Sequence, residues 1–181
     1  MKLKIPNAQL THAGVYVKNM EVMKAFYTKY LGLIVVDQGV LNGTELTFLS
    51  RSDNEHHQVV LAHVPSRVMD GATTLNQISF RMDSLRDLKT YYEMLLPHSL
   101  EGMEPRHHGN SWSFYFFDPE GNKIEIYAVT PWQVHQPWRA PLDLLEPEEK
   151  ILADTQRYAD ALPGSVPLEM WREEMRQKLK G

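Results

Sequence analysis

The sequence predicts an α+β fold with two copies of a βαβββ module, which form curled mixed sheets around a metal-binding cleft, and a C-terminal helical tail. Short stretches rich in alternating and β-branched residues predict strands, and two stretches with apolar residues at helical spacing predict helices. The same order of stretches recurs at an offset of 65 residues, which places His12 on Gln77. After Val129 the composition changes to a proline-rich arm and two further amphipathic stretches.

The first module spans residues 10–64 and begins with LTHAGVYV (10–17), a predicted strand. The next stretch, MEVMKAFYTKYLG, predicts a helix that ends at Gly32, because glycine readily adopts the left-handed backbone of a helix C-cap. Three strands separated by turn residues should follow. They are LIVVDQGV (33–40), TELTFLS (44–50) and QVVLAHV (58–64).

The second module, residues 74–129, repeats this order. A strand is predicted for TLNQISFRM (74–82), and a helix for SLRDLKTYYEMLL with Ser84 as its N-cap. Two strands, NSWSFYFFD (110–118) and NKIEIYAV (122–129), should flank the turn DPEGN. The recurrence favours a duplication, although many unrelated α+β proteins also place aromatic residues on a helix that follows a strand.

The two modules should form one domain, residues 8–130, and residues 131–181 should form the tail. Its proline-rich start predicts an ordered arm on the surface, and prolines precede two amphipathic helices, at 147–162 and 166–180. Packing or dimer contact is the expected role of the tail. Trp132 and Trp138 are candidates for partner anchors or, more simply, for burial against the domain.

Composition excludes several classes of function. The 181 residues carry a net charge of −4 and no basic block, so nucleic acid is not an expected partner. No apolar run reaches the ~20 residues of a membrane helix, and the start MKLKIPNAQL lacks the apolar centre of a signal peptide. The chain has no cysteine, which is consistent with a cytoplasmic protein. Any transition-metal site must therefore use histidine, carboxylate or amide ligands.

Three residues are candidate metal ligands. His12 lies on the first predicted strand of module one, Gln77 occupies the same position in module two, and Glu125 lies on the last strand. Glu125 alternates with apolar neighbours, and a carboxylate is rarely buried without a partner. Taken alone, His12 is more simply explained as a core histidine and Glu125 as a solvated residue. Their pairing across the repeat favours a metal site.

Two histidine pairs are candidates for proton transfer. His56 and His57 are adjacent, so on an extended strand they would face opposite sides. His107 and His108 precede Tyr115, which lies ten residues before Glu125 and should share its face of the sheet. A histidine can shuttle protons near neutral pH, and a tyrosine hydroxyl can donate to an oxyanion. Either pair is also consistent with polar loop decoration.

These motifs resemble those of the vicinal oxygen chelate superfamily, which includes glyoxalase I, bleomycin-resistance proteins and type I extradiol dioxygenases. FLSRSDNEHHQVVLA resembles the segment that carries the active-site histidine of small single-domain extradiol dioxygenases, which would be His57. LNQISF resembles the segment with the second iron ligand, although glutamine replaces histidine. The spacing of Tyr115 and Glu125 matches the family, and the cleft histidine would be His108, with His107 as the alternative.

The resemblance implies a role in the breakdown of aromatic compounds, in which a catechol-like diol is opened by O₂ at a metal ion. His12, Gln77 and Glu125 would hold Fe(II), while His57, His108 and Tyr115 would be catalytic. An amide oxygen is a harder and weaker ligand than imidazole, so Mn(II) or another divalent metal is also consistent with Gln77. Aromatic residues such as Trp112, Phe114 and Phe116 are candidates for the pocket or for the core.

Two other functions are open. The first is a glyoxalase-like isomerase or lyase, although the corresponding stretch of module one offers Leu61 where that enzyme has an acidic ligand. The second is a binding module without a metal, as in bleomycin-resistance proteins. Members of the superfamily often pair modules across subunits, so a dimer is expected.

Overall fold

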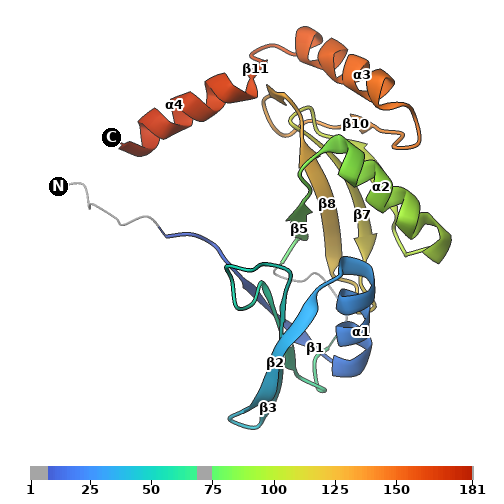
Figure 1. Ribbon diagram of the computed structural model, residues 1–181, viewed down its shortest axis with the longest axis vertical. Coiled ribbons are helices and arrows are strands. Elements are labelled where there is room, and N and C mark those ends of the chain that lie inside the picture. The colour runs from blue at the N-terminus through green and yellow to red at the C-terminus, as the bar shows by residue number, and fades with distance from the viewer. Residues whose placement is uncertain (1–7, 69–74, 181) are drawn as a thin grey trace. The chain divides into compact units, whose positions relative to one another are not determined.

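The computed structural model describes residues 8–68 and 75–180, which belong to two compact units, Met1–Ala72 and Thr73–Gly181. We call them unit 1 and unit 2, and each is described by itself (Figure 1). Residues 1–7, which include most of the stretch examined for a signal peptide, lie outside the described residues, as does Thr74, the first residue of a predicted strand.

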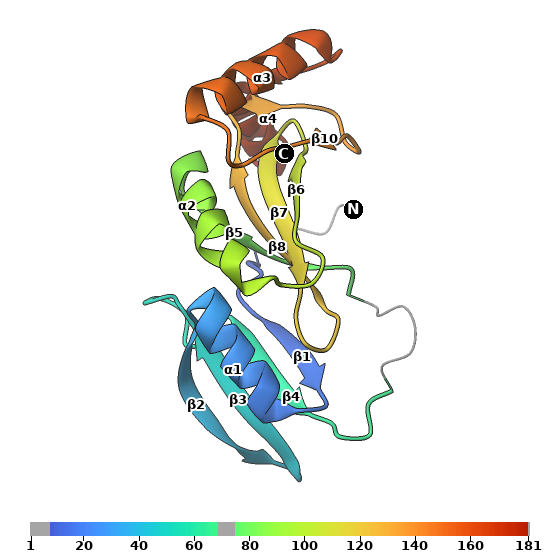
Figure 2. The same cartoon turned by 90° about the vertical axis from the view of Figure 1, so that its right-hand side faces the viewer.

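Unit 1 contains one complete βαβββ module. Its elements are β1 (Ala13–Val17), α1 (Met20–Leu31), β2 (Ile34–Leu41), β3 (Thr44–Ser50) and β4 (Val59–His63). The strand order is β1-β4-β3-β2, with β1 and β4 parallel. Helix α1 crosses one face of this sheet (Figure 2). The Asn19 side chain caps its first turn, and Gly32, at φ 64°, ends it as predicted.

Unit 2 repeats the module. Its elements are β5 (Ile78–Arg81), α2 (Leu85–Leu95), the 3₁₀ turn η1 (Leu96–His98), β6 (Glu104–His107), β7 (Ser111–Phe117) and β8 (Lys123–Val129). The order β5-β8-β7-β6 matches that of unit 1. Ser84 caps α2 as predicted. Strand β6 has no counterpart among the predicted strands, because EPRH carries no apolar alternation.

The strand registers confirm the repeat. In unit 1 Ala13 pairs with Val59, and in unit 2 Ile78 pairs with Ile124, so both partners shift by the same 65 residues. The next rung pairs Gly14 with Val60 in unit 1 and Ser79 with Glu125 in unit 2. Val60 therefore corresponds to Glu125, and the assignment of Leu61 to that position was wrong by one residue, which reverses the face of the strand.

The two faces of the unit 2 sheet differ sharply. Five side chains of β7 and β8 are buried on the face covered by α2 (Figure 1): Trp112, Phe114, Phe116, Ile124 and Ile126. Tyr92 of α2 packs edge-on against Phe114, with ring centroids 5.3 Å apart. Because strand residues alternate, Tyr115 and Glu125 occupy the other face. The three aromatic residues proposed for the pocket are therefore core residues.

The tail is built into unit 2. It contains β9 (Trp132–Gln133), β10 (Ala140–Pro141), α3 (Glu148–Ala161), β11 (Val166–Pro167) and α4 (Leu168–Lys180). Strand β10 extends the sheet beyond β6, and β9 pairs with β11. Most residues of the arm are exposed or half-buried, and Val134 and Leu144 are buried and hold it against the rest of unit 2. Among the described helices, none is long and apolar enough to cross a membrane.

Candidate functional site

A buried carboxylate on the face of the unit 2 sheet opposite α2 organises the site. Glu125 on β8 pairs directly with Tyr115 on β7 and with Ser79 on β5. Its Oε1 accepts a hydrogen bond from the Tyr115 hydroxyl at 2.5 Å. Its Oε2 accepts hydrogen bonds from Gln77 Nε2 at 2.7 Å and from Ser79 Oγ at 2.5 Å. Tyr115 and Glu125 thus share a face, as predicted from their spacing.

Ser79 was missed by the sequence analysis, although a signal was available. It follows Gln77 by two positions at the start of β5, so the period of an extended chain places both side chains on one face. The result is a cluster of Gln77, Ser79, Tyr115 and Glu125, which we call the Glu125 cluster. Glu125 itself is only 8% exposed.

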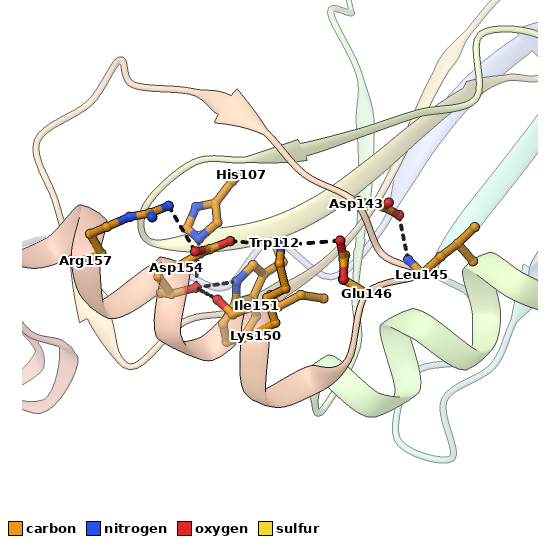
Figure 3. Close-up of polar contacts among 10 residues, drawn as sticks. His107, Trp112, Asp143, Leu145, Glu146, Lys150, Ile151, Asp154 and Arg157 are labelled. Atoms are coloured by element: carbon orange, nitrogen blue, oxygen red, sulfur yellow. Dashed lines mark hydrogen bonds and ion pairs between the residues drawn. The ribbon is translucent and has the colours of Figure 1, made fainter.

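His108 joins the Glu125 cluster, whereas His107 points elsewhere. His108 Nε2 lies 2.9 Å from the Tyr115 hydroxyl oxygen, and its Nδ1 lies 3.2 Å from the carbonyl oxygen of Trp138. His107 is buried on the side of α3, near Trp112 and Ile151 (Figure 3). The structure therefore places His108, the residue preferred from the sequence, beside Tyr115.

Three contacts join the Trp138 carbonyl, His108, Tyr115 and Glu125 in sequence. Together these groups can hold one proton more than a neutral histidine and the tyrosine supply. The carbonyl of Trp138 requires a proton on His108 Nδ1, because a carbonyl oxygen only accepts. The Tyr115 hydroxyl gives its single proton to Glu125, so its oxygen can accept a second proton from His108 Nε2. All three contacts are satisfied when His108 is the imidazolium. Burial and the hydrogen bond to Glu125 raise the pKa of Tyr115 to about 12, so its hydroxyl keeps its proton at neutral pH.

His107 forms a separate buried network beneath α3. Its Nδ1 accepts from the backbone N–H of Gly109 at 2.8 Å, so the ring proton is on Nε2, which lies 2.9 Å from Thr155 Oγ1. The indole N–H of Trp112 donates to the same hydroxyl oxygen at 2.9 Å. Burial lowers the pKa of His107 to about 4, and the ring is therefore neutral. This network fixes α3 to the back of the sheet.

The carboxylate and amide oxygen atoms of the Glu125 cluster fit a divalent cation as ligands. Among the described residues, no lysine or arginine forms an ion pair with Glu125, and the Gln77 carbonyl oxygen accepts no hydrogen bond. A buried carboxylate that has only neutral donors around it can be compensated by a metal ion. Residues 8–68 and 75–180 contain no group of three histidine, cysteine, aspartate or glutamate side chains arranged to hold a metal. The predicted ligand set differs from such a group because one of its three side chains, Gln77, is an amide.

Unit 1 holds the other two predicted residues side by side. His12 lies directly before β1, as Gln77 lies directly before β5. The ring centroids of His12 and His57 are 4.4 Å apart. Burial, followed by the neighbouring His12 and His56, lowers the pKa of His57, which favours a neutral ring that can accept a proton.

His56 and His57 do not lie on an extended strand, so the expectation that they face opposite sides does not apply to them. The segment between β3 and β4 is an irregular loop, which lacks the alternation of an extended strand. The two Nδ1 atoms are 3.0 Å apart, and both rings contact Phe48. His56 is exposed, and His57 is half-buried.

A hollow of about 560 Å³ opens on the same face of unit 2 as Tyr115. It is lined by Gln77, Gly102, Met103, Glu104, Arg106, His108, Tyr115, Phe117, Lys123 and Arg139. This volume is sufficient for a small aromatic ligand. None of the three cationic residues of this lining was predicted from the sequence. Arg139 belongs to the proline-rich arm, and no local pattern marked it.

Comparison with known sequences gives a consistent assignment. Residues 9–126 match the profile of the glyoxalase/bleomycin resistance protein/dioxygenase superfamily. Biphenyl-2,3-diol 1,2-dioxygenase 2 of Rhodococcus globerulus is 31% identical over 121 residues, 65% of this chain and 61% of that protein. Biphenyl-2,3-diol 1,2-dioxygenase 3 of the same organism is 30% identical over 122 residues, 65% of this chain and 62% of that protein. The chain thus spans less than two thirds of the length of these relatives.

Solved structures show the same fold. A glyoxylase/bleomycin resistance protein/dioxygenase domain from Frankia sp. EAN1pec superposes with a TM-score of 0.59 at 18% identity, over 69% of this chain and 94% of that one. A fosfomycin resistance protein from Listeria monocytogenes gives a TM-score of 0.54 at 20% identity, over 69% of this chain and 96% of that one. At these identities the likeness concerns the fold alone.

Proposed function

Because this chain belongs to the glyoxalase/bleomycin resistance protein/dioxygenase superfamily, we propose that it is a metal-dependent dioxygenase that opens a catechol-like aromatic diol with O₂. The observation that carries the proposal is the Glu125 cluster, with His108 attached, beside a hollow large enough for an aromatic ring. The relatives named for biphenyl-2,3-diol support a diol as the substrate class.

We propose that His12, Gln77 and Glu125 hold the divalent metal, with Fe(II) favoured and Mn(II) as the alternative. The equivalent positions of His12 and Gln77, each one residue before the first strand of its module, support this set. When bound, the metal would bring the diol and O₂ together and supply the redox chemistry of ring opening. Ser79 and Tyr115, which donate to Glu125, would orient its carboxylate as outer-sphere partners do in other metal sites.

The protein's own residues would manage the protons of the diol. A catechol must lose protons when it binds as a diolate, and His108 would take one at Nε2, the atom that lies 2.9 Å from the Tyr115 hydroxyl oxygen. Without substrate, Tyr115 donates its proton to Glu125; with substrate bound, the hydroxyl would turn and donate this proton to a substrate oxygen that becomes negative. His57 would act as a general acid or base. In the overall reaction one ring carbon–carbon bond breaks and both atoms of O₂ enter the product.

An isomerase of the glyoxalase type is less well supported. Such an enzyme would need an acidic ligand in module one, and Val60 occupies the position that corresponds to Glu125. The proposed dimer and the cytoplasmic location stay predictions, as does the boundary between a domain at 8–130 and a tail at 131–181. Light scattering of the purified protein would test the dimer.

Elemental analysis of freshly purified protein, followed by assays of metal-reconstituted protein, tests the proposed function. Catechol, 2,3-dihydroxybiphenyl and hydroquinone would be offered with and without O₂. A yellow ring-opened product that forms only with O₂ supports the proposal. Turnover of the methylglyoxal–glutathione adduct would instead support an isomerase. Aromatic binding that survives a chelator, without turnover of any probe, would support a non-enzymatic binding module.

A further inference from the structure

The hollow of unit 2 is lined by an excess of positive charge. Its charged residues are Arg106, Lys123 and Arg139 against a single carboxylate, Glu104. Arg106 forms an ion pair with Glu104, which neutralises both. Among the described residues, neither Lys123 nor Arg139 forms an ion pair with a carboxylate. The hollow therefore has two cations without local compensation, in a chain whose net charge is −4.

Arg139 and Arg106 lie toward one edge of the unit 2 sheet, and Glu125 lies toward the other edge. The strand order is β10-β6-β7-β8-β5. Arg139 directly precedes β10, and Arg106 lies on β6, whereas Glu125 lies on β8 with Tyr115 between them on β7. Two strand spacings of ~4.8 Å separate β6 from β8, a distance of roughly 10 Å. A ring bound with its hydroxyls at the Glu125 cluster would therefore direct a substituent on the opposite side toward the arginines.

The register of β10 fixes the position of Arg139. Ala140 pairs with His107 on β6, so Arg139 is placed at the level of His108, on the outer strand. The preceding residue, Trp138, accepts the contact from His108 Nδ1. The proline-rich arm thus supplies the cation and also a backbone oxygen for the proposed catalytic histidine.

We propose that the substrate is a catechol whose side chain carries a carboxylate, and that Arg139, assisted by Arg106, binds this carboxylate. The inference rests on the proposed function and deepens it by naming the substrate class. Arginine presents a planar fork of donors that matches a carboxylate. Arg139 provides the uncompensated charge, because Arg106 already faces Glu104.

A neutral aromatic substituent fits this lining less well. Met103 and Phe117 are the large apolar side chains of the lining, and apart from Gly102 the other lining residues carry a polar or charged group. An uncharged second ring, as in biphenyl-2,3-diol, would remove water from the cations without replacing their hydrogen bonds, and that loss is unfavourable. An anionic substituent would replace those bonds with charge-assisted ones.

The test measures binding in the absence of O₂, so that turnover is not required. The probes are 3-(3,4-dihydroxyphenyl)propanoate, its methyl ester, and 4-(2-aminoethyl)catechol, which carries a positive charge, and all three have the side chain on the ring side opposite the hydroxyls. Isothermal titration calorimetry of the metal-reconstituted protein would give each dissociation constant. We expect the acid to bind about ten-fold more tightly than the ester, the scale of a partly solvated charge-assisted pair. The cationic probe should bind more weakly than either.

Two variants test whether Arg139 causes the preference for the acid over the ester. Arg139→Gln should remove most of the preference for the acid over the ester, and Arg139→Glu should shift the preference toward the cationic probe. Arg172→Gln, on exposed α4, is the matched control and should keep the wild-type ratio. Equal binding of acid and ester by the wild type, or an unchanged ratio in Arg139→Gln, would overturn the inference. Selective acid binding without any ring opening under O₂ would reject the proposed function and leave the anion site in place.

Discussion

The two modules share one strand topology but carry different side chains at corresponding paired positions of their sheets. In each, the first strand pairs with the last strand, and the last strand pairs with the strand before it, in corresponding register. The corresponding positions, unit 1 first, are His12 and Gln77, Gly14 and Ser79, Phe48 and Tyr115, and Val60 and Glu125. Apart from His12, unit 1 has an apolar side chain or none at these positions, where unit 2 has a carboxylate and its hydrogen-bond donors.

This difference teaches that the repeated backbone supplies positions, whereas a few side chains supply the chemistry. The rung of Ser79, Tyr115 and Glu125 forms a complete hydrogen-bonded set, because each donor meets an acceptor on the neighbouring strand. In unit 1, Phe48 and Val60 fill the same rung, and the polar function is confined to the histidines that lie against Phe48. His12 and His57 belong to unit 1, and Glu125 and the hollow belong to unit 2.

The largest expected effect comes from removing the charge of Glu125, because the corresponding residue of unit 1, Val60, is uncharged. Glu125→Gln keeps the shape of the side chain but removes its charge, so metal affinity should fall by more than roughly 100-fold. Elemental analysis after dialysis should find little metal, and ring opening should fall to background. Glu148→Gln, which breaks an ion pair with Arg86 on the surface, is the control. Stoichiometric metal in Glu125→Gln would show that this carboxylate is not a ligand.

The contribution of unit 1 is tested at His57. If His57 moves protons, His57→Ala should lower turnover by roughly 10³-fold while the metal content stays at the wild-type value. The adjacent exposed residue provides the matched control, and His56→Ala should retain most of the activity. Turnover that is unchanged in His57→Ala would remove the proposed proton-transfer role and leave unit 1 with His12 alone.

The free energy of unfolding should depend on pH through His107, which is buried between the unit 2 sheet and α3. His107 has a pKa of about 4 in the folded chain against 6.5 as its ordinary value, so between these limits the unfolded chain binds a proton that the folded chain does not. The free energy of unfolding should therefore decrease as the pH falls from 6.5 to 4, by about 3 kcal/mol in total.

Urea unfolding of the wild type and of His107→Gln, at pH 7.5 and pH 4.5, measures this contribution. The variant should be less stable at pH 7.5, because a buried hydrogen-bond network is lost, and it should show a smaller decrease at pH 4.5. His98→Gln, at an exposed histidine of η1, should retain the wild-type pH dependence. The same decrease in wild type and His107→Gln would assign the effect to other groups.

The smallest effect concerns the one position at which unit 2 has the weaker ligand. Gln77→His would make unit 2 match His12 of unit 1, and an imidazole holds Fe(II) more tightly than an amide oxygen, so Fe(II) affinity should rise by about ten-fold. Metal titration with a competing chelator provides the measurement. A dissociation constant equal to that of the wild type would indicate that Gln77 faces away from the metal.

Much of the fold could be predicted because its signals are local. Helix caps at Gly32 and Ser84, the turn between β7 and β8, and the period of each strand depend on neighbouring residues only. The shared face of Tyr115 and Glu125 followed from a spacing of ten residues across a tight turn. Strand β6 could not be predicted, because EPRH becomes a strand through its pairing with β7 rather than through its own pattern.

By itself, the sequence determined the duplicated βαβββ plan and the residue types available for a metal, because periodicity and composition are properties of the chain before it folds. Only the tertiary structure decided which of two adjacent histidines meets Tyr115, that Ser79 completes the shell of Glu125, and that Arg139 of the arm reaches the pocket. These outcomes depend on the register between strands distant in sequence, and a shift of one residue would have turned each side chain to the other face.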